Sequence, residues 1–307
     1  MVVPPISGRC RTDVSNDVFF QPLTSTDGCM KELVTKAFRK LITDGFSETA
    51  SAVAGYCRWR IASSGDSLRF FLLTRIGRIY ETKDNWIYQR GIGDRDLLFP
   101  HASDWKRGGK ENRDRMMDYY FSSKFAPLEK GDIVFDVGAY IGITSIVAAE
   151  RAKMVYAIEP SPRARKCLEY NTENYDNIEV LPFAVWNKSE EIELEYGLTS
   201  SEDGLITPDD GGDGQSVAVQ AHSIATIADI VNVDQIDFVK IEAEGVEPEI
   251  VDGMANANVK KVSSTGNAER YGETTYQEVS DKLTSQGYSV LINPNHNYKM
   301  VYGKKNP

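Results

Sequence analysis

The chain has 307 residues, of which 41% are hydrophobic and 26% charged, proportions typical of a folded globular protein. Its formal net charge of -10 argues against a general nucleic-acid binder, which needs clustered lysine and arginine side chains to contact phosphates. No stretch approaches the roughly 20 apolar residues that cross a bilayer, and residues 1–13 lack the basic-then-apolar pattern of a signal peptide. We therefore expect a cytoplasmic protein without a membrane span.

Residues 1–114 predict a mixed helical and extended segment, which we expect to form a separate α+β extension. Apolar side chains recur at helical spacing in residues 30–42, and residues 50–62 also favour a helix, whereas residues 68–79 are rich in strand-forming side chains. The basic cluster at residues 106–110 is more simply a solvated loop than a phosphate site. This extension is a candidate for acceptor binding or oligomerisation, and the oligomeric state stays open.

Residues 115–307 alternate short strand-like runs with helical runs, a pattern typical of a parallel sheet covered by helices on both faces. We expect strands at residues 133–137, 154–159, 178–185, 191–196, 217–220, 236–241 and 259–263. We expect helices at residues 141–151, 161–174, 223–231, 246–254 and 274–286. Residues 288–292 and 298–302 predict a closing antiparallel hairpin, and the acidic residues 200–214 a flexible loop. The second domain is therefore predicted to be α/β.

A glycine-containing turn follows the first strand of this domain. Asp136 ends the strand, and Gly138 and Gly142 let the backbone turn sharply and approach a ligand without a Cβ atom in the way. The next strand ends at Glu159, where a carboxylate can accept hydrogen bonds from both hydroxyls of a ribose. Because the carboxyl ends of parallel strands form the binding crevice of such sheets, we expect a nucleotide-type cofactor here.

Both NAD enzymes and S-adenosylmethionine (SAM) enzymes use a glycine-rich turn followed by an acid, and three details favour SAM. The spacing is Asp-x-Gly-x-x-x-Gly, whereas dinucleotide sites read Gly-x-Gly-x-x-Gly. Asp136 stands where it would repel a pyrophosphate but meet the cationic amino end of SAM. The closing hairpin is the third detail. The alternative for Asp136 is a buried carboxylate that caps its own turn.

Three segments together resemble the FkbM-type methyltransferases: residues 136–142 (Asp-Val-Gly-Ala-Tyr-Ile-Gly), 157–160 (Ala-Ile-Glu-Pro) and 239–247 (Val-Lys-Ile-Glu-Ala-Glu-Gly-Val-Glu). The resemblance covers roughly residues 115–292. It implies the class I fold of SAM-dependent enzymes, a Rossmann-like and mostly parallel sheet of seven strands with the last hairpin antiparallel. It also implies O-methylation, often of sugars, glycolipids or secondary metabolites, and therefore a small-molecule or glycan acceptor.

The same resemblance implies cofactor-binding roles for seven residues: Asp136, Gly138, Tyr140, Gly142, Glu159, Phe183 and Ala184. The last two would lie at the edge of the adenine. This chain departs from the family pattern at two positions, with Tyr140 where asparagine is usual and Glu242 where aspartate is usual. The change at Tyr140 bears on how the turn meets the methionine end of SAM.

Lys240, Glu242 and Glu244 alternate at the end of the strand predicted for residues 236–241, so we expect their side chains on one face. Methyl transfer to a hydroxyl needs in-line alignment of the reactants and gains from a base that takes the hydroxyl proton. We assign these three residues a catalytic role, in which Lys240 keeps nearby carboxylates ionised and Glu242 or Glu244 positions the acceptor or accepts its proton. An ion-pair cluster that holds Gly245 at the next helix explains the pattern equally well.

Several other kinds of site find no support in the sequence. His101, His222 and His296 are isolated, so no metal site is expected, and the four scattered cysteines indicate reduced core residues. Residues 242–245 replace the Asn/Asp-Pro-Pro-aromatic motif of many amine- and base-methylating enzymes, which lowers the expectation of a nucleic-acid substrate. Two alternatives stay open: an NAD(P)-dependent oxidoreductase, and a non-catalytic module that binds SAM for assembly or regulation.

Overall fold

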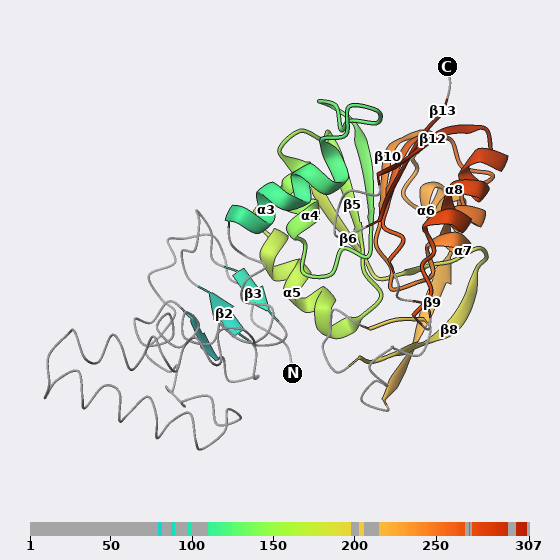
Figure 1. Ribbon diagram of the computed structural model, residues 1–307. Coiled ribbons are helices and arrows are strands. Elements are labelled where there is room, and N and C mark those ends of the chain that lie inside the picture. The colour runs from blue at the N-terminus through green and yellow to red at the C-terminus, as the bar shows by residue number, and fades with distance from the viewer. Residues whose placement is uncertain are drawn as a thin grey trace, which may run out of the picture. The chain divides into compact units, whose positions relative to one another are not determined.

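The computed structural model describes residues 79–81, 87–89, 97–99, 110–197, 203–205, 215–267, 270, 272–293 and 299–305. The chain divides into two units, residues 1–90 and 91–307, which are described separately (Figure 1). The elements predicted in residues 30–78 and the basic loop at residues 106–109 lie outside the described residues. The predicted domain boundary after residue 114 stays a prediction.

Short strands begin the described part of the chain. In the first unit, β1 (Ile79–Glu81) pairs antiparallel with β2 (Ile87–Gln89). The second unit begins with β3 (Leu97–Phe99), which is held by a side chain from a distant helix. The backbone N–H of Leu98 donates to Asn171 Oδ1 at 2.7 Å, and Asn171 Nδ2 donates back to the Leu98 carbonyl at 3.0 Å. Asn171 therefore satisfies both backbone polar groups of Leu98.

Seven strands form the central sheet of the second unit, in the order β12-β13-β11-β10-β4-β5-β6 (Figure 1). Their bounds are β4 (Ile133–Val137), β5 (Met154–Ile158), β6 (Ile178–Leu181), β10 (Ile236–Ile241), β11 (Val259–Ser264), β12 (Tyr288–Asn293) and β13 (Met300–Lys305). The strands from β11 to β6 pair in parallel, and β13 is antiparallel to both of its neighbours. The predicted seven-stranded, mostly parallel sheet with an antiparallel last hairpin is confirmed.

Helices cover both faces of this sheet, as predicted (Figure 1). On one face lie α3 (Lys110–Met116), η2 (Met117–Phe121), α4 (Ile143–Ala149) and α5 (Pro162–Thr172). On the other lie α6 (Ile224–Ile230), α7 (Glu247–Asp252) and α8 (Tyr276–Ser285). Strands covered on both faces bury nearly every side chain, which explains their continuous apolar runs. None of the helices in the described ranges combines the length and apolarity that crossing a bilayer requires.

One predicted strand is wrong. Residues 178–185 were expected to form a single strand, but β6 ends at Leu181 and the chain changes sheet at Pro182. Proline has no N–H to donate to a strand neighbour, so the ladder stops there. The following β7 (Ala184–Val185) pairs in parallel with β9 (Ser216–His222), which pairs antiparallel with β8 (Glu190–Glu195). The strand expected at residues 178–185 therefore belongs to two sheets.

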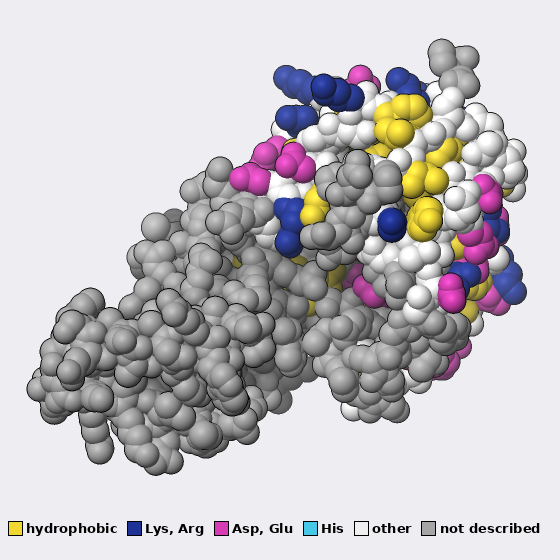
Figure 2. All heavy atoms as spheres, viewed as in Figure 1, with side chains coloured by type: hydrophobic (Ala, Val, Ile, Leu, Met, Phe, Trp, Pro, Cys, Tyr) yellow, Lys and Arg dark blue, Asp and Glu magenta, His cyan; other side chains and the backbone are white. Residues whose placement is uncertain are grey.

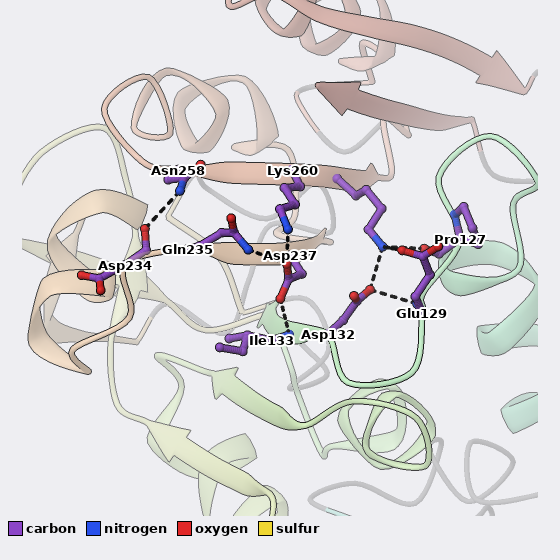
Figure 3. Close-up of polar contacts among 10 residues, drawn as sticks. Pro127, Glu129, Asp132, Ile133, Asp234, Gln235, Asp237, Asn258 and Lys260 are labelled. Carbon is purple, nitrogen blue, oxygen red and sulfur yellow. Dashed lines mark hydrogen bonds and ion pairs between the residues drawn. The ribbon is translucent and has the colours of Figure 1, made fainter. Parts of the chain in front are cut away.

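Polar groups, of which Lys261 and Asp132 are nearly buried, join the amino ends of the central strands (Figure 3). Lys261 Nζ lies 2.7 Å from Asp132 Oδ2 and 3.0 Å from both Glu129 Oε2 and the Pro127 carbonyl oxygen. The hydrogen bond and charge of Lys261 lower the pKa of Glu129. This arrangement fastens β11 to the segment that leads into β4.

Asp237 fastens β10 to β4 at the same end of the sheet (Figure 3). Its carboxylate accepts the backbone N–H of Ile133 at 3.0 Å and bonds with Lys260 Nζ at 3.0 Å. Burial pushes the pKa of Asp237 upward, but these two bonds outweigh it and hold the pKa below its usual value. The amino end of the sheet is thus a network in which charged groups are stabilised by their partners.

Candidate active site

The turn after β4 contains two glycines in the left-handed region of backbone space. Gly138 has a φ of 70° and Gly142 a φ of 89°. A Cβ atom on Gly138 would lie 1.8 Å from the carbonyl oxygen of Glu242, and one on Gly142 would lie 2.6 Å from Leu168 Cδ1. Glycine is needed at both positions, because the turn passes so close to the end of β10 and to α5.

Tyr140 lies between these glycines and also has a positive φ, of 53°. A non-glycine residue in this conformation costs roughly 1–2 kcal/mol, and asparagine tolerates it better than tyrosine. The backbone N–H of Tyr140 donates to Glu159 Oε2 at 2.8 Å. The turn therefore holds a strained residue whose backbone is fixed by the acid at the end of β5.

Glu159 is held by backbone groups on both of its carboxylate oxygens. Oε2 accepts from Tyr140, and Oε1 accepts the backbone N–H of Ser161 at 2.8 Å. Burial raises the pKa of Glu159 to about 7, against the opposing effect of these two bonds. Each carboxylate oxygen has a second lone pair, so the oriented group can accept further hydrogen bonds from a ligand.

Asp136 and Lys240 form a fully buried ion pair. Their strands pair in register at these two residues, and Lys240 Nζ lies 3.0 Å from Asp136 Oδ1. The other oxygen, Oδ2, accepts the hydroxyls of Thr144 and Ser145, each at 2.6 Å. The charge of Asp136 is therefore neutralised within the protein, and its remaining oxygen is occupied by the first turn of α4.

Lys240 also joins the glycine turn after β4 to the end of β10. Its ammonium donates to the carbonyl oxygens of Gly138 at 2.8 Å and Val137 at 3.2 Å, and lies 3.6 Å from Glu242 Oε2. Burial would lower the pKa of Lys240, but Asp136 and Glu242 outweigh it and raise the pKa. The Glu242 side chain is 31% exposed, so it is the end of this charged row that a ligand can reach.

Another buried acid, Glu247, braces the turn after β10. Its Oε1 accepts the backbone N–H groups of Ala243 at 3.1 Å and Gly245 at 3.3 Å, and its Oε2 accepts the hydroxyl of Thr275 at 3.1 Å. Burial raises the pKa of Glu247. Glu244 within this turn has a φ of 49°, and β10 ends at Ile241. Strand alternation therefore does not place Glu244 on the face of Lys240, contrary to expectation.

Another acid, Asp203, is connected to Glu159 through Ser161. Its Oδ2 accepts the hydroxyl of Ser161 at 2.6 Å and Arg163 Nε at 2.8 Å, and the Arg163 guanidinium also pairs with Oδ1. Burial raises the pKa of Asp203 even though Arg163 and Ser161 oppose it. Ser161 thus contacts Glu159 through its backbone and Asp203 through its side chain, which connects the segment after β8 to the acid at the end of β5.

Phe183 and Ala184 lie at the crossover between the two sheets. The Phe183 ring meets the His222 imidazole edge to face, with ring centres 4.9 Å apart. His222 Nδ1 lies 3.0 Å from Ser189 Oγ, and burial lowers the pKa of this histidine. Ala184 is buried and pairs with Ala221 in β9. His222 is therefore occupied by neighbours in its own small sheet.

The sequence matches the family described as "Methyltransferase FkbM domain" over residues 136–290, which is more than half of the chain. The chain belongs to the FkbM methyltransferase family. The resemblance inferred from the three sequence segments is thereby confirmed, and the alternative of an NAD(P)-dependent oxidoreductase loses its support. No curated protein matches the sequence.

Solved structures of low sequence identity are similar to this FkbM chain. A methyltransferase FkbM from Methylobacillus flagellatus is 15% identical with a TM-score of 0.43, over 66% of this chain and 52% of that one. A precorrin-6y C5,15-methyltransferase from Geobacter metallireducens is 14% identical with a TM-score of 0.40, over 64% and 90%. Fibrillarin from Aeropyrum pernix, solved with natively bound S-adenosyl-L-methionine, is 11% identical with a TM-score of 0.39, over 73% and 92%. This chain spans about half the length of the FkbM structure.

The FkbM domain brings most of the predicted site residues to one end of the sheet. Five of them surround the turn after β4 or contact it: Asp136, Gly138, Tyr140, Gly142 and Glu159. Lys240 and Glu242 join this turn from β10, whereas Glu244 lies in the next turn. Among the described residues, no group of three or more histidine, cysteine, aspartate or glutamate side chains is arranged to hold a metal ion. His101 and His296 lie outside the described residues.

Sequence reasoning missed several residues that hold this site together. Glu247 had a visible signal, since it follows Gly245 closely and begins α7. Thr144 and Ser145 also had one, because hydroxyls in the first turn of a helix after a glycine turn can reach back to the strand end. No sequence signal indicates a role for Asp203. Its partner Arg163 is 40 residues away in the sequence, so the contact depends on the fold.

Proposed function

We propose that this FkbM domain is a SAM-dependent O-methyltransferase that acts on a hydroxyl of a sugar, glycan, glycolipid or small metabolite. One observation carries the proposal. The buried Asp136–Lys240 pair joins the glycine turn after β4 to Glu242, a carboxylate that is partly exposed at the end of β10. A cofactor turn and a candidate proton acceptor are thereby fixed next to each other, which is the arrangement that transfer between two bound molecules requires.

The groups around the turn fit SAM. Glu159 is oriented by two backbone N–H groups and keeps lone pairs for the two ribose hydroxyls. Gly138 leaves no side chain between the turn and the end of β10. Asp136 is buried and paired with Lys240, so we assign it an indirect part, in which it holds the turn through Lys240. The contact predicted between Asp136 and the amino end of SAM stays a prediction.

Bound SAM supplies an electrophilic methyl group on a sulfonium sulfur. The residues of the chain then have three tasks: to align the acceptor, to exclude water and to receive the hydroxyl proton. We assign the last task to Glu242, since it is the exposed end of the charged row. Lys240 is a positioning residue, because its contacts are to Asp136, Glu242 and backbone carbonyls. Glu244, in the adjoining turn, is assigned to the acceptor side.

The acceptor class is supported by charge. The chain is acidic, with a formal net charge of -10, and on the face seen in Figure 2 the described basic and acidic side chains are interspersed. A phosphate-rich acceptor favours clustered cations, so this distribution favours a small or saccharide acceptor over nucleic acid. Phe183 and Ala184 stay assigned to the edge of the adenine, where Phe183 offers an aromatic ring that is only half buried.

Calorimetry with SAM, S-adenosylhomocysteine and NAD tests the cofactor. We expect both sulfur nucleotides to bind and NAD not to bind, because the turn has the acid and spacing described above. If neither sulfur nucleotide binds, the proposed function is wrong. Mass spectrometry of glycans and lipids from cells with and without the protein then tests the reaction. The expected difference is one methylene, and its absence together with tight SAM binding would indicate a non-catalytic module.

The substitution Glu242→Gln tests the proton acceptor once an acceptor is in hand. We expect SAM affinity to be retained and turnover to fall about 100-fold or more, as for loss of a general base. Glu190→Gln is the matched control, because the Glu190 side chain is 34% exposed and also lies within 3.0 Å of a lysine, Lys188. Unchanged turnover in Glu242→Gln would remove this residue from the base role.

A further inference from the structure

A cavity of about 540 Å³ lies beside η2, at the edge of the sheet formed by β12 and β13. Loop residues 122–125, which follow η2, form one wall, and Leu291, Asn293 and Tyr302 form the other. Its volume falls within the range of pockets that hold small organic ligands, roughly 300–1,000 Å³. The site described above does not include this cavity.

The cavity lies at the same end of the sheet as Glu242. One row of paired residues crosses four strands, from Ile241 through Ser264 and Val301 to Ile292. Glu242 and Asn293 directly follow the two ends of this row. Neighbouring strands lie about 4.8 Å apart, so three spacings separate the two positions by about 14 Å. A molecule that reaches from Glu242 to the cavity must therefore be longer than a single sugar ring.

The lining combines hydroxyl and amide groups with apolar surface. Ser122, Ser123 and Asn293 offer both hydrogen-bond donors and acceptors. Phe125 is half buried, and Leu291, which is 43% exposed, is one of only two large hydrophobic residues exposed among the described residues. In Figure 2, hydrophobic side chains gather on the face where β12 and β13 lie. A saccharide matches this lining, because its rings have apolar C–H faces and hydroxyl edges.

The charges of the lining distinguish a saccharide from a polyanion. Asp118 and Lys124 are the charged residues of the described lining, one of each sign. A nucleic acid or a phosphorylated ligand would need several uncompensated cations, whereas a neutral ligand needs none. The balance therefore favours a neutral molecule with many hydroxyl groups.

We propose that this cavity binds a saccharide unit a few units along the chain from the one that is methylated, so that the acceptor is a neutral oligosaccharide or glycan. The proposal rests on the proposed function, because it assumes that the reacting hydroxyl lies at Glu242. It makes the cavity a specificity site: the chain distinguishes a glycan from a monosaccharide through contacts about 14 Å from the reaction, three strand spacings away.

Saturation-transfer NMR on the full chain tests this proposal, with maltotetraose, cellotetraose and chitotetraose as probes and glucose as the short control. The protein is saturated with S-adenosylhomocysteine, whose binding is measured separately by calorimetry. We expect at least one tetrasaccharide to bind at least about tenfold more tightly than glucose, a difference of about 1.4 kcal/mol. Failure of all three to bind while S-adenosylhomocysteine binds would overturn the cavity proposal alone. Failure of S-adenosylhomocysteine to bind would overturn the proposed function.

Variants then locate the binding. Ser122→Trp fills the cavity from an exposed position, and we expect it to weaken tetrasaccharide binding about tenfold or more without changing S-adenosylhomocysteine affinity. Leu291→Ser should weaken binding as well. Ile230→Ser is its matched control, since Ile230 on α6 is the other exposed large hydrophobic residue of the described chain, at 46%. Full tetrasaccharide binding in Ser122→Trp, or an equal loss in Ile230→Ser, would overturn the assignment to this cavity.

Discussion

The two ends of the central sheet each contain a buried lysine, and the two lysines have different surroundings. At the amino end, Lys261 pairs with Asp132 and with Glu129, whose side chain is 69% exposed. At the carboxyl end, Lys240 and its partner Asp136 are both fully buried. At the amino end the pKa values of Glu129 and Asp237 lie below their usual values, whereas at the carboxyl end burial raises the pKa of Glu159 to about 7. Partners thus stabilise the charged form of Glu129 and Asp237 at the amino end, whereas burial disfavours the charged form of Glu159 at the carboxyl end.

The two ends of the sheet also differ in backbone strain and in buried hydroxyl groups. Among the non-glycine residues with a positive φ, Asn232 near the amino end is of a type that tolerates this conformation, whereas Tyr140 and Glu244 at the carboxyl end are not. Within the described residues, the hydroxyls of Ser263 and Thr265, at and just after the end of β11, are buried without a hydrogen-bond partner. Strain and unsatisfied groups gather at functional sites, since the rest of the fold must hold them in place. The strained residues and the two hydroxyls lie at the end of the sheet where we propose the active site.

The largest expected effect is the loss of stability when a glycine at the carboxyl end, rather than one at the amino end, is replaced by alanine. Gly138→Ala should destabilise the chain by about 5 kcal/mol or more, because its Cβ would lie 1.8 Å from the Glu242 carbonyl oxygen in addition to the cost of a positive φ. Gly131→Ala should cost only about 1–2 kcal/mol, since a Cβ there has nothing within 4 Å. Urea denaturation measures both. Equal losses would show that the close approach of turn and strand is not what requires glycine.

The second largest expected effect is the loss of stability when one of the two buried lysines is replaced. Lys240→Met should cost about 3–4 kcal/mol and weaken S-adenosylhomocysteine binding, because it leaves Asp136 buried without its counter-ion and frees the Gly138 carbonyl. Lys261→Met should cost less, about 1–2 kcal/mol, because water can reach Glu129. Denaturation and calorimetry on both variants test this. Loss of S-adenosylhomocysteine affinity in Lys261→Met would contradict the division between the two ends.

Glu159 predicts a pH dependence of cofactor binding. Its pKa is raised from 4.5 to about 7, so its contribution to stability is complete below pH 4.5 and is lost as the pH rises through 7. Ribose hydroxyls bind best to the ionised form, and S-adenosylhomocysteine affinity should therefore rise about tenfold between pH 6 and pH 8. Calorimetry across this range tests the effect, with Glu159→Gln as the control in which the slope disappears. A flat profile in the unaltered protein would exclude Glu159 as the titrating contact.

The smallest expected effect concerns the strained turn. Tyr140→Asn should stabilise the chain by about 1 kcal/mol, because asparagine tolerates a φ of 53° better than tyrosine. The reverse change, Asn232→Tyr, should cost a similar amount, since Asn232 has a φ of 54°. Thermal unfolding measures both shifts. If Tyr140→Asn instead destabilises the chain, contacts of the tyrosine ring outweigh the backbone strain.

Sequence reasoning succeeded where the physical cause is local. Continuous apolar runs predicted the buried strands, and the motif spacing predicted that the glycine turn and Glu159 lie together at one end of the sheet. The single strand predicted for residues 178–185 is divided into β6 and β7 because Pro182 has no N–H to continue the ladder. Lys240 was expected to lie near carboxylates. That Asp136 is the carboxylate depends on β4 and β10 being neighbours, a long-range fact.

The remaining features could not be read from the sequence, because they depend on contacts between distant segments. The bonds of Asp203 to Ser161 and Arg163 join two such segments. The cavity joins residues 118–125 to Leu291, Asn293 and Tyr302, and its charge balance appears only when these segments meet. Hydrophobic pattern and motif spacing do not encode such pairings, which are set by the order of strands in the sheet.

The Asp136–Lys240 pair also has an evolutionary consequence. Each residue is fully buried, and loss of either one leaves an uncompensated charge in the core, whereas replacement of both by apolar residues of similar volume can leave stability nearly unchanged. The two positions should therefore change together or remain together along a lineage, although they lie in separate motifs more than 100 residues apart. Their effects on stability are strongly non-additive, so neither position can drift alone.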